Sequence, residues 1–232
     1  FHDVLYKAFN RNEHISYLPL GQPRNDTILA VHDKIKIDST ISGLDRFSED
    51  ELLESKKVLY CPTWRNYAKT LFFPFSKFDP VILNEFLERE NIIIFTREHP
   101  YYEFEKPHGV ENIKRVVQIN SDVLSDITPF LSCFDMMITD YSSIFIDFLI
   151  TGKPVVFVPY DLHKYETLVG FSKPYKDIAF GEHVHDFSDF LEVIGSNSFA
   201  GYTQEYLSAF NIKPTGNCLE HYLKLKELIK LG

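Results

Sequence analysis

Residues 134–162 read FDMMITDYSSIFIDFLITGKPVVFVPYDL, and this stretch decides the fold. Met136–Thr139 is an apolar run of strand length, and Asp140-Tyr141-Ser142-Ser143 follows it where a helix must begin. After a short helix, the turn Gly152-Lys153-Pro154 leads into a second apolar run, Val155–Val158. The order strand, helix, strand predicts two parallel strands with a pair of serines at the start of the connecting helix.

Ser142 and Ser143 have two interpretations at this position. Hydroxyl groups and free backbone N–H groups at a helix start, just after a strand, suit the binding of a phosphate. Serine at a helix start is also a common cap, which satisfies the N–H groups of the first turn without any ligand. The sequence of this segment alone leaves both interpretations open.

The alternation of strands and helices continues through most of the chain. We expect strands at Val58–Cys61, Ile92–Thr96 and Val116–Ile119, and helices at Pro80–Arg89 and near Ile127–Ser132. Strands that are apolar throughout and alternate with helices indicate a parallel sheet that is covered on both faces. The expected fold is therefore an α/β domain with a Rossmann-like, doubly wound parallel sheet.

The two ends of the chain have weaker patterns. Near the N-terminus we expect a helical start over Val4–Phe9, and Ser48-Glu49-Asp50 reads as a helix start or a linker. From Asp186 onward the pattern predicts a helical C-terminal tail. Its expected helices are Phe187–Ile194, Gln204–Phe210 and Cys218–Leu231. We interpret the last one, which has an apolar stripe, as a covering helix.

The composition limits the kinds of protein that this chain can be. Its 232 residues, 44% of them hydrophobic, can bury one substantial core. The 33 acidic and 24 basic residues give a formal net charge of −9, which argues against binding nucleic acid or an anionic membrane through overall charge. A local basic pocket for an anion is compatible with this balance.

The cysteines and the length of the apolar runs bear on the compartment. Cys61, Cys133 and Cys218 are far apart and form no CxxC pair, so we expect neither a disulfide framework nor a cysteine zinc site. No apolar run approaches the length of a membrane span, so a cytoplasmic location with at most peripheral membrane contact is expected. The chain begins on Phe1 without a Met, which leads us to expect a missing upstream region.

Polar residues follow the predicted strands at the points where the strands end. Arg65 follows the first strand, Arg97 and His99 follow the second, and Ser142 and Ser143 follow the fourth. Ligands of open parallel sheets bind at these carboxyl ends, so we expect the five side chains to crowd one rim. Guanidinium groups hold phosphate oxygens in bidentate fashion, and a histidine can donate a proton to a phosphoryl oxygen. The pattern favours a phosphorylated or nucleotide ligand, although each arginine alone fits a surface ion pair equally well and His99 alone fits a structural role.

Other kinds of site have less support. The sequence contains neither GxGxxG nor GxxxxGK[ST], which argues against a dinucleotide fold of the usual kind and against a P-loop ATPase. Ser142 does not lie in a GxSxG elbow, so a nucleophilic hydrolase is not expected. His183–Asp186 contains two histidines, but no further ligand stands at a recognisable spacing, so we expect no metal site there.

Four stretches resemble those of a known family, the CDP-glycerol:poly(glycerophosphate) glycerophosphotransferases of teichoic acid and capsule polymer synthesis. Gly21–Asp26 (GQPRND) resembles the family's G-x-PRND loop, and Tyr60–Arg65 (YCPTWR) resembles its Y-x-PTWR turn. Arg97–Pro100 (REHP) is similar to its R-x-HP element. Ile138–Asp147 (ITDYSSIFID) is close to its LITDYSSxxxD segment, and Lys153–Tyr165 continues with its KP, strand and YD-x-x-x-Y pattern.

The resemblance implies both a fold and an activity. The family has a GT-B architecture of two Rossmann-like lobes, and the nucleotide donor is held mainly by the C-terminal lobe, which this chain resembles. Residues 1–50 would form a connecting segment and the entrance to the lobe, and residues 51–232 would form the donor-binding domain. The implied activity is the transfer of glycerol phosphate or ribitol phosphate from a CDP-activated donor to a hydroxyl of a teichoic acid or capsular polymer, with release of CMP.

The resemblance also implies roles for individual residues. His99 is the catalytic candidate, and the implied donor-binding residues are Arg24, Arg65, Arg97, His99, Ser142, Ser143 and Asp147. No cofactor or metal is implied, because positioning and charge neutralisation of the leaving CMP would suffice. The implied partners are the CDP-polyol and a polymer or lipid-linked acceptor, which would bring peripheral contact with the inner face of the cell membrane. Nucleic acid is not an expected partner.

Two departures from the family pattern limit these implications. The family's proposed general base is a histidine of the N-terminal lobe, and neither His2 nor His14 stands in a matching context. The fragment alone is therefore expected to bind the donor without turning it over. The family also often has an arginine before a Gly-Phe pair, where this chain has Val169 before Gly170-Phe171. One donor contact is in doubt for that reason.

Two other functions fit the same residues. A GT-B glycosyltransferase that moves a sugar from a nucleotide sugar would have a similar fold and a similar diphosphate site. A non-catalytic nucleotide-binding lobe would bind the donor without releasing CMP.

Overall fold

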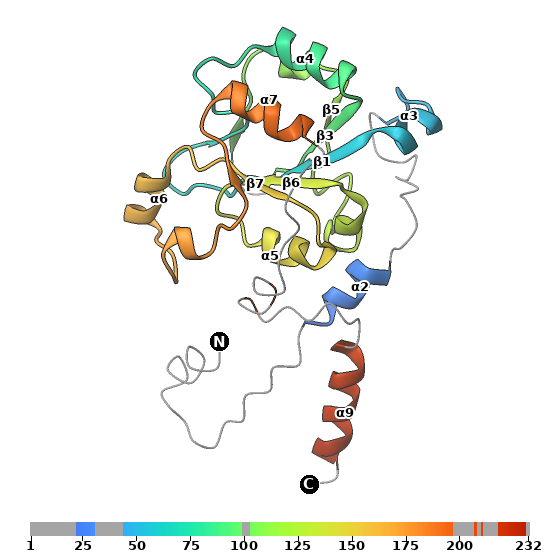
Figure 1. The fold of residues 1–232 in the computed structure, drawn as a ribbon. Coiled ribbons are helices and arrows are strands. Elements are labelled where there is room, and N and C mark those ends of the chain that lie inside the picture. Colours follow the sequence, from blue (N-terminus) through green and yellow to red (C-terminus); the bar gives the residue numbers. More distant parts are fainter. Residues whose placement is uncertain are drawn as a thin grey trace.

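A six-stranded parallel sheet forms the centre of the computed structural model, which describes residues 22–30, 44–98, 103–196, 207, 210 and 218–230 (Figure 1). The strand order is β5-β3-β1-β6-β7-β8, and every neighbouring pair is parallel. The strands are β1 (Lys56–Tyr60), β3 (Ile92–Thr96), β5 (Val116–Gln118), β6 (Met136–Thr139), β7 (Val155–Phe157) and β8 (Glu182–His183). The expected α/β fold with a parallel sheet is confirmed.

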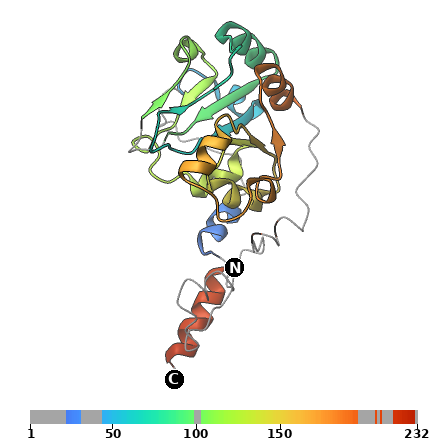
Figure 2. The same cartoon turned by 90° about the vertical axis from the view of Figure 1, so that its left-hand side faces the viewer.

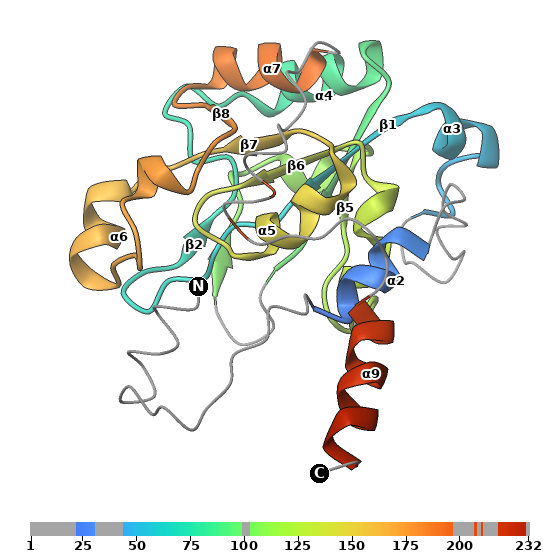
Figure 3. The same cartoon turned by 60° about the horizontal axis from the view of Figure 1, so that its bottom comes forward.

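Helices cover both faces of this sheet. On one face lie α4 (Pro80–Arg89) and α7 (Phe187–Gly195), and on the other lie α5 (Ile144–Phe148) and α2 (Arg24–Ala30) (Figure 3). All residues of β3 and β6 are buried, because their side chains alternate between two apolar cores. Double coverage explains why these strands read as continuous apolar runs rather than as alternating ones.

The strand order reverses once, between β1 and β6. From β1 the chain moves outward to β3 and β5, then returns to the other side of β1 and continues through β6, β7 and β8. The loops after β1 and β6 therefore leave the sheet side by side and diverge. This is the topological switch point of a doubly wound sheet, where ligands of such folds bind.

Local signals explain where the helices begin. Ser48 and Glu51 form a reciprocal capping box at the start of α3 (Glu49–Glu54), which confirms the helix start expected at this position. Asp79 caps α4, and Pro80 occupies its first turn. The short helix expected near Ile127–Ser132 is a 3₁₀ helix, Thr128–Cys133. The remaining elements are β2 (Thr70–Leu71), β4 (Phe104–Glu105), α6 (Leu162–Leu168) and the 3₁₀ turns Val110–Asn112, Leu149–Thr151 and Tyr175–Asp177.

The C-terminal helices lie at the expected positions, but the interpretation of the last one as a covering helix is wrong, because Leu219 and Leu223 of its apolar stripe are 57% and 53% exposed. α7 and α9 (Cys218–Lys230) match two of its predicted helices, whereas Val4–Phe9 and most of Gln204–Phe210 lie outside the described residues. α9 extends away from the sheet (Figure 2), and its Leu219 N–H donates to Asp26 Oδ2 of α2 at 2.8 Å. Among the described residues, no helix has both the length and the apolarity that crossing a membrane requires.

Candidate functional site

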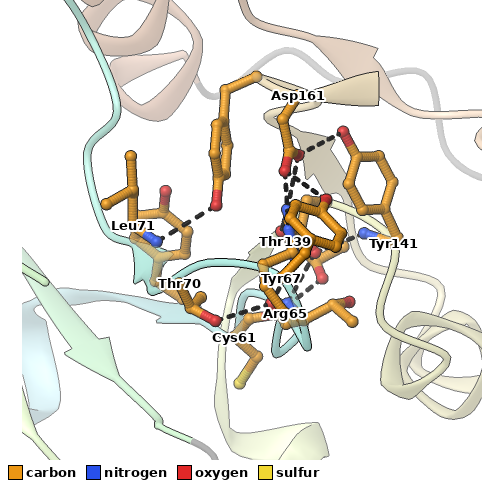
Figure 4. Close-up of polar contacts among 12 residues, drawn as sticks. Cys61, Arg65, Tyr67, Thr70, Leu71, Thr139, Tyr141 and Asp161 are labelled. Atoms are coloured by element: carbon orange, nitrogen blue, oxygen red, sulfur yellow. Dashed lines mark hydrogen bonds and ion pairs between the residues drawn. The ribbon is translucent and has the colours of Figure 1, made fainter. Parts of the chain in front are cut away.

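Arg65 is the centre of a buried polar cluster at the switch point (Figure 4). Its Nε and Nη2 donate to the two carboxylate oxygens of Asp161 at 2.9 and 2.8 Å. Nη2 also donates to Asp140 Oδ2 at 2.8 Å, and Nη1 donates to the carbonyl of Thr63. The Arg65 side chain is 0% exposed. These bonds occupy all but one of the N–H groups that a guanidinium carries.

The two carboxylates of the cluster are equally well occupied. Asp161 also accepts the hydroxyl of Tyr67 at 2.6 Å and that of Tyr141 at 3.1 Å. Asp140 Oδ1 accepts the backbone N–H groups of Thr63, at 2.7 Å, and of Tyr141. Thr63 lies just after β1, Asp140 just after β6 and Asp161 just after β7. The cluster therefore joins the loops that follow these three strands.

Aromatic rings enclose the guanidinium of Arg65. Its Cζ lies 4.9 Å from the ring centre of Tyr141, 5.0 Å from that of Tyr160 and 5.2 Å from that of Tyr165. The Tyr175 hydroxyl donates to the carbonyl of Asp140 at 3.0 Å. Rings at these distances attract a cation and exclude water, so the ion pairs of Arg65 are weakly screened.

The pKa directions show that this cluster stays charged. Burial lowers the pKa of Arg65, but the hydrogen bond to Asp161 and the charge of Asp140 outweigh it, so the net shift is upward. Burial raises the pKa of Asp161, yet its bonds to Arg65 and Tyr67 outweigh burial and leave that pKa below its usual value. Burial also raises the pKa of Tyr160 to about 12.

The turn at Ser142 and Ser143 lies beside the cluster and differs from it. Ser142 is half-buried and Ser143 is exposed. Ser143 stands at the N-terminus of α5, and its side chain makes no capping hydrogen bond. Within the described part of the chain, the backbone N–H groups of Ser142, Ser143 and Ile144 have no hydrogen-bond acceptor. The structure therefore does not support the capping interpretation, and it leaves a row of free donors at the switch point.

Arg24 and Asp147, two of the predicted site residues, contact each other across the edge of this turn. Arg24 Nε lies 3.0 Å from Asp147 Oδ1, although 123 residues separate them in the sequence. The Arg24 side chain is 53% exposed and that of Asp147 is 15% exposed. Arg24 begins α2 and Asp147 lies in α5, so the pair links the N-terminal segment to the helix that follows the serines.

Arg97 supports the loop after β5. Its Nη1 donates to the carbonyls of Ile119 at 3.0 Å and Leu124 at 2.7 Å, and its Nη2 donates to that of Ser125 at 3.2 Å. Burial lowers the pKa of Arg97. Arg97 forms no ion pair with any residue that the structure describes. Among the described residues, Asp126 is the carboxylate that acts on the charge of Arg97, and it does so without an ion pair.

Glu98 was given no role in the sequence analysis, yet it is buried at the end of β3. Its carboxylate lies 2.8 Å from Lys106 Nζ and accepts the amide of Gln118 at 2.6 Å. Burial raises the pKa of Glu98, and the two partners oppose that shift. A cavity of about 510 Å³ lies alongside, with Arg46, Lys106, Gln118 and Asn120 in its lining. The signal that would have found Glu98 is a charged residue placed directly after an apolar strand.

The predicted site residues thus have different surroundings. The structure brings Ser142, Ser143, Arg24 and Asp147 to one region, while His99 lies outside the described residues. Arg65 is buried and most of its N–H groups are bonded, so direct contact with a ligand would require this network to open, whereas an open rim was expected. Sequence analysis also gave no role to the acids and tyrosines around Arg65. Each acid directly follows a buried strand or its short extension, which is the signal that could have identified it.

No candidate metal site emerges from the described residues, since they contain no group of three or more His, Cys, Asp or Glu side chains placed to hold a metal ion.

Comparison with known proteins identifies the family. The sequence profile of the CDP-glycerol:poly(glycerophosphate) glycerophosphotransferases matches residues 2–213. The chain belongs to this family. Among curated relatives, it is 26% identical over 194 residues to the teichoic acid ribitol-phosphate polymerase TarL of Staphylococcus aureus, covering 79% of this chain and 32% of the relative. It is 30% identical over 163 residues to the teichoic acid glycerol-phosphate transferase of the same organism, covering 68% of this chain and 39% of the relative.

Longer matches point to the same group. The chain is 24% identical over 231 residues to the teichoic acid glycerol-phosphate primase of Bacillus subtilis, which covers 97% of this chain and 54% of the primase. A solved structure of the wall teichoic acid polymerase TagF matches with a TM-score of 0.63 at 20% identity and covers 99% of this chain and 56% of that one. At that identity the structural likeness shows the fold. The chain spans about a third to a little over half of the length of these relatives.

Proposed function

We propose that this chain binds a CDP-activated polyol, CDP-glycerol or CDP-ribitol, at the switch point between β1 and β6. In this proposal it is the donor-binding part of a transferase that adds polyol phosphate to a teichoic acid or capsular polymer and releases CMP. The observation that carries the proposal is the row of free N–H donors at Ser142–Ile144, in a member of this family and at the sheet edge where ligands bind.

The chemistry asks for little covalent participation by the protein. A hydroxyl of the acceptor attacks the phosphorus that carries the polyol, a new P–O bond forms, and the bond from this phosphorus to the bridging oxygen breaks. CMP leaves with the electron pair, and the hydroxyl proton must pass to a base. Such transfers are accelerated mainly by positioning and by stabilising the negative charge on the phosphoryl oxygens.

The described residues can supply both effects. In this proposal, the N–H groups and hydroxyls of Ser142 and Ser143 donate to phosphate oxygens, and Arg97, which forms no ion pair among the described residues, adds positive charge near the end of β3. We assign Arg24 and Asp147 to the rim of the donor site, and His99 to the phosphoryl group as an acid or hydrogen-bond donor. The base for the attacking hydroxyl is proposed to lie in the part of the family that this chain does not span.

The names of the relatives support a polyol phosphate as the transferred group. They comprise glycerol-phosphate and ribitol-phosphate polymerases, primases and transferases of teichoic acid synthesis. One of the solved structures of TagF is that of a variant soaked with CDPG. Because these acceptors are cell-wall polymers, we include peripheral contact with the inner face of the membrane, through the acceptor, in the proposal.

Ligand binding by the chain tests this function. Isothermal titration with CDP-glycerol, CDP-ribitol, CMP-sugars and UDP-sugars should show binding of a CDP-polyol and of CMP. Binding of UDP-sugars alone would contradict the proposal and favour a nucleotide-sugar glycosyltransferase. If a CDP-polyol binds but the full-length protein releases no CMP in the presence of an acceptor polymer, the chain is a non-catalytic nucleotide-binding lobe.

A further inference from the structure

We propose that Arg65 is a positioning residue, which holds the Asp140–Ser143 turn in the shape that binds the donor's phosphates and does not itself touch the donor. This inference rests on the proposed function, because it assumes that the turn receives the diphosphate. It differs from the direct contact that the family resemblance implies for Arg65.

The guanidinium of Arg65 already donates most of its N–H groups to other residues. Its bonds to Asp161, Asp140 and the Thr63 carbonyl use four N–H groups, and the side chain is completely buried. Both oxygens of Asp161 accept two hydrogen bonds each, so Asp161 has no capacity left for a replacement partner. The one remaining N–H group is buried with the rest of the side chain, and a bidentate contact with a phosphate would have to displace a carboxylate that is already held.

Several bonds of the cluster end on Asp140 and Tyr141, the two residues just before Ser142. Asp140 is held at its carboxylate by Arg65 and at its carbonyl by Tyr175. Tyr141 is held at its backbone N–H by Asp140, at its hydroxyl by Asp161 and at its ring by the guanidinium. With these two residues fixed, the direction of the following free N–H groups is fixed as well. Donors of fixed direction lose less entropy when they bind an anion.

A further argument concerns charge. One guanidinium stands against two carboxylates, so the cluster formally carries one excess negative charge. A cluster of this sign cannot attract an anionic diphosphate through its field, and its benefit to binding must come from geometry. The two roles of Arg65 therefore predict opposite effects when a carboxylate of the cluster is neutralised.

Asp161→Asn separates the two roles. The substitution removes a negative charge and leaves Arg65 with a free N–H group, so a direct contact predicts that CDP-glycerol binds equally well or more tightly. Positioning predicts weaker binding, with the dissociation constant raised about tenfold, because the turn loses its support. Arg65→Lys and the double variant should show a similar rise, since residues that act as one unit are not additive. Tighter binding by Asp161→Asn would overturn the proposal.

Arg115→Lys is the matched control. Arg115 is also a buried arginine, 7% exposed, but it binds Glu88 and Asn91 at the amino ends of the strands. Its replacement should lower the melting temperature and leave the dissociation constant for CDP-glycerol within about twofold of the parent value. An equal loss of donor affinity in Arg115→Lys and Arg65→Lys would show a general loss of stability and would overturn the positioning role.

Amide hydrogen exchange of the ligand-free chain tests the role of Arg65 without relying on donor binding. In Arg65→Lys, the amides of Thr63 and Tyr141 should exchange at least about tenfold faster, because both donate to Asp140, while amides within β3 keep their protection. Unchanged protection of the two amides would refute positioning by Arg65. If neither CDP-glycerol nor CMP binds the parent chain, the proposed function fails, and the exchange measurement still decides whether Arg65 holds the turn.

Discussion

Two buried arginines lie at opposite ends of the strands of the same sheet. Arg115 lies at the amino ends of the strands. It binds Glu88 at 3.0 Å and Asn91 Oδ1 at 3.0 Å, close to the residues that precede β1, β3 and β5. Arg65 lies at the carboxyl ends of the strands. It binds two carboxylates and joins the loops after β1, β6 and β7. Each arginine contacts residues beside three strands, but of the two only Arg65 does so at the carboxyl ends of the strands, where ligands of such sheets bind.

The comparison separates stability from function in this fold. At the amino ends of the strands, backbone groups near Arg115 bind one another, as in the bond from Lys56 N–H to the Asn91 carbonyl at 2.9 Å and the bond from Ile94 N–H to the Arg115 carbonyl at 2.8 Å. At the carboxyl ends of the strands, Arg65 and its two carboxylates make many hydrogen bonds with one another and with nearby groups, while the backbone N–H groups of Ser142–Ile144 have no acceptor among the described residues. A rigid support beneath unsatisfied donors is the arrangement that a binding site for an anion requires.

The largest expected difference between the two arginines is in the free energy of unfolding that is lost when each is replaced by alanine. Arg65→Ala leaves two carboxylates without their cation and should lower the free energy of unfolding by about 3–5 kcal/mol. Arg115→Ala should cost less, about 1–3 kcal/mol, because its partner Glu88 is 46% exposed and can be solvated. Urea unfolding of both variants measures this difference. Equal losses would mean that the two clusters are equivalent supports.

Arg97→Ala should have the next largest effect. It removes the donors to the carbonyls of Ile119, Leu124 and Ser125, so about 1–3 kcal/mol of stability should be lost. It also removes a positive charge from the proposed donor site, so CDP-glycerol affinity should fall roughly tenfold or more. Calorimetric titration at two salt concentrations measures the second effect, with Arg97→Lys as the variant that keeps the charge. An unchanged affinity in Arg97→Ala would exclude Arg97 from the donor site.

Acid should lower the stability of the Arg65 cluster by protonating Asp161. The pKa of Asp161 is lower in the folded chain than its usual value near 3.9, so its contribution to stability is present above about pH 4 and disappears as the pH falls through the folded pKa. Asp161→Asn should therefore unfold with a shallower pH dependence below pH 4, by at most about 1.4 kcal/mol per pH unit. Chemical denaturation between pH 3 and pH 6 tests this, and identical slopes would contradict it.

The smallest expected effect on stability belongs to Ser143→Ala. Because the Ser143 hydroxyl caps nothing, its loss should change the free energy of unfolding by no more than about 0.5 kcal/mol. Donor affinity should nevertheless fall, since the proposed function uses this hydroxyl. The exposed pair of Lys69 and Glu103 offers a control, and Lys69→Ala should alter neither quantity measurably. A loss near 1 kcal/mol in Ser143→Ala would restore the capping interpretation.

The backbone of this fold was largely predictable from the sequence. The predicted bounds of Pro80–Arg89, Ile92–Thr96 and Met136–Thr139 agree with the structure, because apolar runs and caps are local signals. β8 was not predicted, since Glu182-His183 is short, polar and at the edge of the sheet. Its residues carry no apolar periodicity that a sequence pattern could detect.

The polar cluster was not predictable in the same way. The sequence indicated that Arg65 follows a strand, but its partners Asp140 and Asp161 lie 75 and 96 residues further along the chain. Whether an arginine at a strand end faces a ligand or a carboxylate depends on which loops the topology brings together. The motif and the strand ends can be read from the sequence, but the distance between the loops in space cannot.

The same sequence separations bear on how the chain folds. Contacts that close loops of 75 and 96 residues form slowly, because the chain entropy of closing them must be overcome first. The proposed donor site is therefore complete only when β1, β6 and β7 have all assembled, and a partly folded chain would lack the turn that binds the donor. A ligand that binds only this finished state shifts the folding equilibrium toward it by mass action. Cellular supply of the nucleotide would then also govern how long the folded chain survives proteolysis.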